Sequence, residues 1–296
     1  RTPIGTYKGS LKNIKAYQLG SVVIKEVLKR ADLASEEVDE IIIGQVLTAG
    51  MGQNPARQAA LEAGIPVSKP SHIVNQVCGS GLRAVISGLQ SIKLGESSKV
   101  ITGGQESMSI TPNLIFNKNL KKNLENELVD TMVYDGLLDA FNNYHMGVTA
   151  ENVAKQFDIS REQQDEFALD SQKKTQDAII NGRFKNELIE IDLNGNSLKK
   201  DEHPRNNLTL NDLQKLKTVF MENGTVTPGN SSGINDGAAA LLLTSLDYAD
   251  KKSMEPLAKI VSWASVGVEP SLMGLGPIGA VQKAIKIAKW KIEDVD

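Results

Sequence analysis

Apolar positions near the start of the chain fall at two spacings, one helical and one strand-like. Leu19, Val23 and Val27 recur every four residues, which predicts an amphipathic helix over 17–30. The run 40–47 (EIIIGQVL) is short, apolar and β-branched, which predicts a buried strand. These two segments begin an alternation of helices and strands.

The alternation continues over the next sixty residues. The pattern predicts a helix over 53–64, a strand over 71–77, a helix over 79–93, and a strand over 99–102 that ends at Gly103. Strands that alternate with helices indicate an α/β fold, in which helices cover a parallel or mixed sheet.

The middle of the chain is more polar. Ser160 followed by Gln163 fits a capping box, so a long polar helix is expected from there to about Asn181, with Gly182 just past its end. We interpret 109–235 as an inserted loop domain.

Apolar segments return after this region. The runs 238–244 (AAALLLT) and 257–264 (LAKIVSWA) predict two more strands, and 280–290 has the spacing of an amphipathic helix. The predicted domains are an N-terminal domain over 1–108 and 236–258, the loop domain over 109–235, and the start of a C-terminal domain over 259–296.

Composition limits the possible partners. A chain of 296 residues, 40% of them hydrophobic, can bury a large core and form more than one domain. The formal charge of -3 argues against a nucleic-acid surface, which needs a basic excess. Asparagine and leucine interrupt the basic run 118–122 (KNLKK), which we interpret as a solvated face. The sequence contains no apolar run of about 18 residues, so no membrane span is predicted.

Cys78 is the only cysteine. It cannot form an internal disulfide, which favours a reducing compartment such as the cytoplasm. It lies in NQVCGSGLRA (75–84), between a predicted strand and a predicted helix. The free N–H groups of a helix start favour a thiolate, and the N–H of Cys78 itself is placed to hold an oxyanion. The segment therefore fits an acyl-transfer nucleophile, but position and composition alone favour a buried cysteine that only packs.

Other candidate groups are weaker. His72 and His203 fit surface or packing roles, and His145, in the apolar segment NYHMG, fits a structural role better than a catalytic one. No HxxxH or CxxC spacing suggests a metal site. The glycine-rich turns 50–55 and 229–233 suit a ligand loop or an ordinary turn.

Seven segments together resemble the thiolase family, specifically its biosynthetic, acetoacetyl-CoA-forming branch. They occur in the family's order and span the chain. These segments are RTPIG (1–5), GQNPARQAA (52–60), NQVCGSGLRA (75–84), GGQESMS (103–109), YHMGVTAENVA (144–154), GTVTPGNSSGINDGAAA (224–240) and SVGVEPSLMGLGPIGA (265–280).

The resemblance implies a thiolase-like fold, with α-β-α-β-α layers, mixed five-stranded sheets and the inserted loop domain. It also implies a reversible Claisen condensation of two acetyl-CoA molecules to acetoacetyl-CoA and CoA, through an acetyl group carried by Cys78. CoA thioesters would be the substrates, and no separate cofactor is implied. A homo-oligomer, either a dimer or a tetramer, is implied as well.

The resemblance also assigns a substrate site. His145 and Met146 match residues that line the pantetheine and acyl pocket, Leu137 matches an apolar pocket position, and Ser232 matches a serine that contacts pantetheine. Lys217 stands where many relatives have an arginine near the CoA nucleotide, and it lacks the planar fork of arginine. Pro228 replaces a usual alanine and removes one backbone donor.

The family's NEAF segment, its GHP histidine and its second cysteine do not occur in 1–296. We interpret the chain as C-terminally incomplete and expect a first strand before Arg1. Two alternatives stay open, namely a thiolase-like CoA- or lipid-binding protein without turnover and a 3-ketoacyl-CoA thiolase with a broader chain-length range. The segments HMGVTAENVA and GQNPARQ disfavour a β-ketoacyl synthase.

Overall fold

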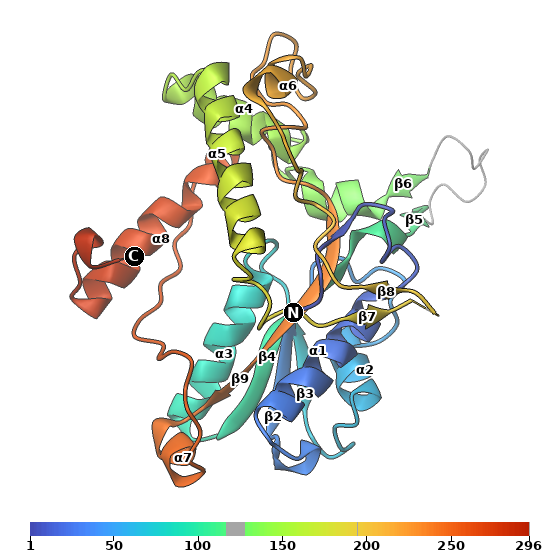
Figure 1. Ribbon diagram of the computed structural model, residues 1–296, viewed down its shortest axis with the longest axis vertical. Coiled ribbons are helices and arrows are strands. Elements are labelled where there is room, and N and C mark those ends of the chain that lie inside the picture. Colours follow the sequence, from blue (N-terminus) through green and yellow to red (C-terminus); the bar gives the residue numbers. More distant parts are fainter. Residues whose placement is uncertain (117–127, 194, 296) are drawn as a thin grey trace. The chain divides into compact units, whose positions relative to one another are not determined.

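The computed structural model describes residues 1–116, 128–193 and 195–295 (Figure 1). These residues form two compact units, each assembled from segments that are distant in sequence. The first unit comprises Arg1–Gly136, Gly182–His203 and Gly233–Glu255, and the second comprises Leu137–Asn181, Pro204–Ser232 and Pro256–Asp296. The domain bounds expected from the sequence stay a prediction.

A five-stranded mixed sheet organises the first unit (Figure 1). Strand β2 runs parallel to both β3 and β4, and β9 runs antiparallel to β4 and β1. This arrangement confirms the predicted α/β class and the mixed sheet. In spatial order the strands are β1 (Gly5–Thr6), β9 (Asn235–Thr244), β4 (Lys99–Ser107), β2 (Glu40–Gly44) and β3 (Ser71–Val74).

Three helices of the first unit, α1 (Ala16–Arg30), α2 (Pro55–Glu62) and α3 (Ser80–Leu94), cover the two faces of the sheet. Successive side chains of a strand point to opposite faces. Accordingly, Ile41 and Ile43 of β2 pack in the cluster formed with α1 and α2, whereas Ile42 packs with Ala84 of α3. Each of these isoleucines is at most 1% exposed, and burial of such a side chain contributes roughly 1.5–3 kcal/mol.

The ends of three strands differ from the prediction. Strand β4 does not end at Gly103 but continues to Ser107, because β9 pairs with it along its whole length. Strands β2 and β3 are shorter than expected and end at Gly44 and Val74. Since β2, β3 and β4 are parallel, their carboxyl ends lie together at one end of the sheet. Ligands of α/β folds usually bind at this end of the strands.

The second unit is mainly helical. Its helices include α4 (Met146–Gln156), α5 (Arg161–Ile180), α6 (Leu210–Gln214), the 3-10 helix η6 (Pro270–Leu275) and α8 (Gly276–Ala288). The predicted capping box is confirmed, because Ser160 Oγ accepts from Gln163 N at 3.2 Å and the Gln163 side chain accepts from Ser160 N at 2.8 Å. Gly182, at φ +66°, follows the end of α5 as expected.

The remaining elements of the two units are short. They are β5 (Asn113–Leu114), β6 (Val129–Asp130), the π-helical turn η5 (Met132–Leu137), β7 (Ile191–Asp192), β8 (Ser197–Leu198) and α7 (Leu246–Lys251), with 3-10 turns η1 (Ser35–Glu37), η2 (Met108–Ile110) and η7 (Ile292–Asp294). The basic run 118–122 lies outside the described residues. In the described parts of the chain, no helix is long and apolar enough to cross a bilayer.

Two predictions near the end of the chain had different outcomes. The helix expected over 280–290 is confirmed as α8, which begins earlier, at Gly276. The strand predicted over 257–264 is wrong, because none of the described strands pairs with this segment. A strand needs a partner for its N–H and C=O groups, and apolar β-branched residues alone do not supply one.

Candidate active site

Cys78 lies in the turn between β3 and α3, and it is exposed. Its position contradicts the interpretation that it is a packed core residue. The preceding residue, Val77, has φ +47°, a left-handed conformation that a β-branched residue seldom adopts. The side chain of Asn75 accepts from Val77 N at 2.9 Å, and Gly79 N donates to Gln76 O at 3.1 Å. These contacts hold the sharp turn that presents the thiol.

Ser80 ties this turn to the first residues of α3. Its buried hydroxyl accepts from Gln76 N at 2.9 Å and donates to Val77 O. Gly79 is the N-cap residue of α3 and has no side chain to satisfy the helix's first N–H groups. A helix start generally favours negative charge nearby, and here Gly79 N and Ser80 N already donate to Gln76 O and Val77 O.

Glycines let the start of α3 lie directly on the sheet. A Cβ at Gly44, the last residue of β2, would overlap the main chain of Ser80 and Gly81. A Cβ at Gly104 of β4 would lie 3.4 Å from Gly81 Cα. The main chain of α3 therefore contacts the main chain of two strands just beyond Cys78.

Glu106 of β4 holds the segment that follows β2. Its carboxylate accepts from Val46 N at 2.8 Å and from Leu47 N at 3.3 Å, and Asn75 Nδ2 donates to Val46 O at 3.3 Å. Burial raises the pKa of Glu106 to about 7, against the effect of the N–H donors, and the charge of Asp236 adds to the increase. Glu106 lies in the segment GGQESMS, yet sequence reasoning assigned it no role.

His145 is the N-cap residue of α4. Its Nδ1 accepts from Gly147 N at 3.0 Å, which assigns the ring proton of the neutral imidazole to Nε2. Burial lowers the pKa of His145, so the neutral form is favoured. The ring stacks on Phe220, with the two centroids 4.6 Å apart. Sequence reasoning missed Phe220, because no local pattern links it to His145.

The other predicted site residues lie in the same unit as His145. Met146 is the first residue of α4, and Leu137 immediately precedes Leu138, which pairs with His145 in an isolated bridge. The structure thus brings together Leu137, His145 and Met146. Both Leu137 and Met146 are partly buried.

Lys217, Pro228 and Ser232 are exposed. They lie on two segments of the second unit that are joined where Val219 N donates to Val226 O at 3.3 Å. Cys78 belongs to the first unit, whereas Leu137, His145, Met146, Lys217, Pro228 and Ser232 belong to the second.

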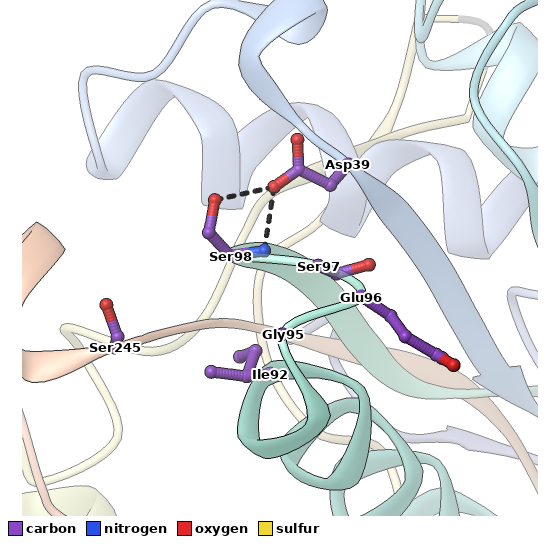
Figure 2. A pocket seen from close by; sticks show the side chains of 7 residues that line it. All are labelled: Asp39, Ile92, Gly95, Glu96, Ser97, Ser98 and Ser245. Carbon is purple, nitrogen blue, oxygen red and sulfur yellow. Dashed lines mark hydrogen bonds between the residues drawn. The ribbon is translucent and has the colours of Figure 1, made fainter.

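A hollow of about 380 Å³ lies at the far end of α3 from Cys78. Figure 2 shows its polar lining, in which Asp39 accepts from Ser98 N at 2.9 Å and from Ser98 Oγ at 2.8 Å. Asp39 also forms an ion pair with Lys99 at 3.2 Å. Its lining includes three serines but no histidine or cysteine, and we do not consider it a reaction site. Among the described residues, no three His, Cys, Asp or Glu side chains are grouped to hold a metal.

Comparison with known proteins places this geometry in context. Residues 1–247 match the family described as "Thiolase, N-terminal domain", and residues 254–296 match "Thiolase, C-terminal domain". An acetyl-CoA acetyltransferase of Shinella zoogloeoides is 49% identical over 300 residues, which are 100% of this chain and 76% of that protein. A cytosolic acetyl-CoA acetyltransferase of Rattus norvegicus is 48% identical over 302 residues, with the same coverage of both chains.

A solved structure agrees with these sequence relatives. The crystal structure of the Bacillus anthracis acetyl-CoA acetyltransferase superposes with a TM-score of 0.95 at 38% sequence identity. The match covers 100% of this chain and 76% of that one. The sequence relatives and the solved structure therefore lead to the same group of proteins.

Proposed function

This chain belongs to the thiolase family, and from that premise we propose that Cys78 is the nucleophile of an acetyl-CoA C-acetyltransferase reaction. The chain is an acyltransferase that condenses two acetyl-CoA molecules to acetoacetyl-CoA and CoA, and the reaction is reversible by thiolysis. CoA thioesters are the substrates in this proposal, and no separate cofactor takes part. The observation that carries the assignment is the exposed thiol at the start of α3.

The reaction divides into two half-reactions at a covalent intermediate. The Cys78 thiolate attacks the carbonyl carbon of acetyl-CoA, the thioester bond breaks, and CoA leaves as a thiolate that takes up a proton. The product is an acetyl thioester on Cys78. A second acetyl-CoA loses its α-proton to a base, and its carbanion attacks this thioester. Acetoacetyl-CoA is released and the Cys78 thiolate is restored, which predicts ping-pong kinetics.

Two features of the turn support this role for Cys78. Val77 is held in a left-handed conformation by neighbouring hydrogen bonds, so the thiol projects from a sharp turn rather than from a regular element. Cys78 also directly precedes Gly79, the N-cap of α3, a position where a helix generally favours negative charge, and we assign the N–H of Cys78 to the oxyanion that develops on the carbonyl oxygen.

We assign the acyl pocket to Leu137, His145 and Met146, together with Phe220. A stacked and neutral imidazole presents an apolar face and one N–H donor, which suits the short acyl group and the amides of pantetheine. We assign CoA contacts to Lys217, Pro228 and Ser232. In domain terms, 1–108 with 236–258 carries the nucleophile, 109–235 binds CoA, and 259–296 begins the C-terminal domain.

We further propose a homo-oligomer, a dimer or tetramer, located in the cytoplasm. Among the described strands, β3 pairs only with β2, so its outer side has no strand partner. Val77 and Leu82, which follow β3 closely in the sequence, are 49% and 71% exposed. Light scattering after size exclusion tests the assembly. The single cysteine and the name of the cytosolic rat relative support the compartment.

The decisive experiment replaces the sulfur. Cys78→Ala in the complete protein is expected to abolish thiolysis of acetoacetyl-CoA, while calorimetric titration still detects CoA binding. Wild-type protein incubated with acetyl-CoA should gain the mass of one acetyl group, and the variant should not. Retained turnover in Cys78→Ala refutes the assignment of the nucleophile, and CoA binding by a wild-type protein that never becomes acetylated supports the non-catalytic alternative.

A further inference from the structure

Asp165 is a buried acid on a helix that is otherwise accessible to solvent. Of the residues of α5, all of which the structure describes, only Asp165 is buried, and it is 0% exposed. Its Oδ2 accepts from Arg161 Nε at 2.8 Å and its Oδ1 accepts from Asn230 Nδ2 at 2.9 Å. A carboxylate taken out of water is expensive unless it is paired and hydrogen-bonded, and here each oxygen has a partner.

The two partners of Asp165 reach two different segments. Arg161 Nη2 donates to Leu213 O at 2.7 Å and to Leu216 O at 3.1 Å, which fixes the chain immediately before Lys217. Arg161 thereby joins α5 to the end of α6. Because the guanidinium offers several donors in a fixed plane, it can contact Asp165 and both carbonyls at once.

Asn230 fixes the second segment. Its Nδ2 donates to Thr225 O at 3.0 Å as well as to Asp165, and its Oδ1 accepts from Thr227 N at 2.8 Å. The neighbouring Ser231 Oγ donates to Thr227 O at 2.7 Å. These bonds close the 225–231 loop on itself and orient it through Asp165.

The two segments also pack against each other. A Cβ at Gly229 would lie 2.5 Å from side-chain atoms of both Leu213 and Leu216. The 227–230 turn thus rests on the same residues whose carbonyls Arg161 holds. A substitution that alters the side chain of Asp165 is therefore expected to displace the segment before Lys217 and the 225–231 loop together.

We infer that Asp165 is the positioning residue that aligns the segment before Lys217 with the loop that carries Pro228 and Ser232, so that both contact one CoA molecule. This inference rests on the proposed function, because it takes these three residues as CoA contacts. Asp165 itself touches no substrate in this account. It acts through Arg161 and Asn230.

The test compares Asp165→Asn with a matched control on the same helix. In Asp165→Asn one amide oxygen can accept from Arg161, but the amide nitrogen then faces Asn230 Nδ2, donor against donor. The control is Asp170→Asn, since Asp170 pairs with Lys174 at 2.7 Å on the exposed side of α5, where both side chains are more than half exposed. Calorimetric titration with free CoA is the primary measurement.

We expect the Kd for CoA to rise about tenfold or more in Asp165→Asn and to stay within about twofold of wild type in Asp170→Asn. The rate at which iodoacetamide alkylates Cys78 should not change, because Cys78 lies in the other unit. The KM for acetoacetyl-CoA should rise with little change in kcat. A loss of folded protein would instead lower the apparent kcat and leave KM unchanged.

The outcomes are separable. A wild-type protein that does not bind CoA overturns the proposed function, whatever the variants do. A wild-type protein that binds CoA, with an unchanged Kd in folded Asp165→Asn, overturns the inference alone. If Asp165→Asn does not fold, Arg161→Lys decides, because its single ammonium can pair with Asp165 but cannot also reach both carbonyls. An unchanged Kd in Arg161→Lys then overturns the inference.

Discussion

The imidazole of His145 lies nearly parallel to the ring of Phe220, with the centroids 4.6 Å apart and the planes inclined by 20°. Gly147 makes this contact possible, because a Cβ at that position would overlap the Phe220 ring. The start of α4 and the 217–220 segment are therefore packed around one glycine. This packing sets the orientation of the imidazole.

The first prediction concerns that glycine. Gly147→Ala is expected to lower the free energy of unfolding by roughly 1–3 kcal/mol, because the added methyl group forces the Phe220 ring to move. Gly267→Ala is the matched control, since no heavy atom lies within 4 Å of its added Cβ. Chemical denaturation gives both values. Equal effects in the two variants would contradict the packing described here.

Replacement of His145 should affect substrate binding more than chemistry. His145→Ala is expected to raise the KM for acetoacetyl-CoA more than it lowers kcat, because the proposed function assigns the neutral ring to the acyl pocket and gives it no proton to transfer. Phe220→Leu keeps the imidazole and removes the stacked ring, so it should raise KM by a smaller factor. Initial-rate thiolysis measures both. If kcat and kcat/KM fall equally in His145→Ala, the ring acts in the transition state.

Glu106 should make stability depend on pH. Burial favours the protonated form and raises the pKa of Glu106 from its usual 4.5 to about 7 in the folded protein. The stabilisation is fully present below about pH 4.5 and is lost as the pH rises through about 7. Relative to Glu106→Gln, the wild type should lose on the order of 3 kcal/mol of unfolding free energy across this window. Urea denaturation at pH 5 and pH 8 measures the unfolding free energy of both proteins. If the difference between them is the same at the two pH values, the prediction is wrong.

Val77→Gly should separate stability from activity. Glycine adopts the left-handed conformation of residue 77 without strain, which offsets the entropy that glycine loses on folding, so the change in unfolding free energy should be near zero. Val67→Gly is the control at an exposed valine with no positive φ, and it should cost roughly 0.5–1 kcal/mol. The looser turn is expected to lower kcat for thiolysis. A larger stability loss in Val77→Gly than in Val67→Gly would show that the strain is not released.

Local patterns predicted the elements that local interactions determine. Helix α1 follows from an apolar stripe, and the start of α5 follows from Ser160 and Gln163, which satisfy each other's backbone N–H groups. The extension of β4 through Gly103 and Gly104 depends instead on pairing with β9, more than 130 positions later, which overrides the weak strand propensity of glycine. The segment 257–264 is the opposite case: its composition is typical of a strand, but none of the described strands pairs with it.

The candidate site shows the same division. Cys78 was identifiable because its turn is built from residues 75–80, all adjacent in sequence. Glu106 contacts Val46 across 60 positions, and Asp165 contacts Asn230 across 65. The residues that flank such a carboxylate in the sequence give no sign that a distant partner buries it. It can therefore be identified only in the folded chain.

The glycine contact between α3 and the sheet has a consequence for redesign. Because Gly44 and Gly104 let backbone rest on backbone at Ser80 and Gly81, the main-chain contact itself limits how closely the start of α3 approaches the strands. Aliphatic residues deeper along α3 can therefore be exchanged for others of similar volume while the sulfur keeps its place. A library that varies those residues but leaves the glycines alone should yield many active members, whereas alanine at position 44 should give none with wild-type turnover.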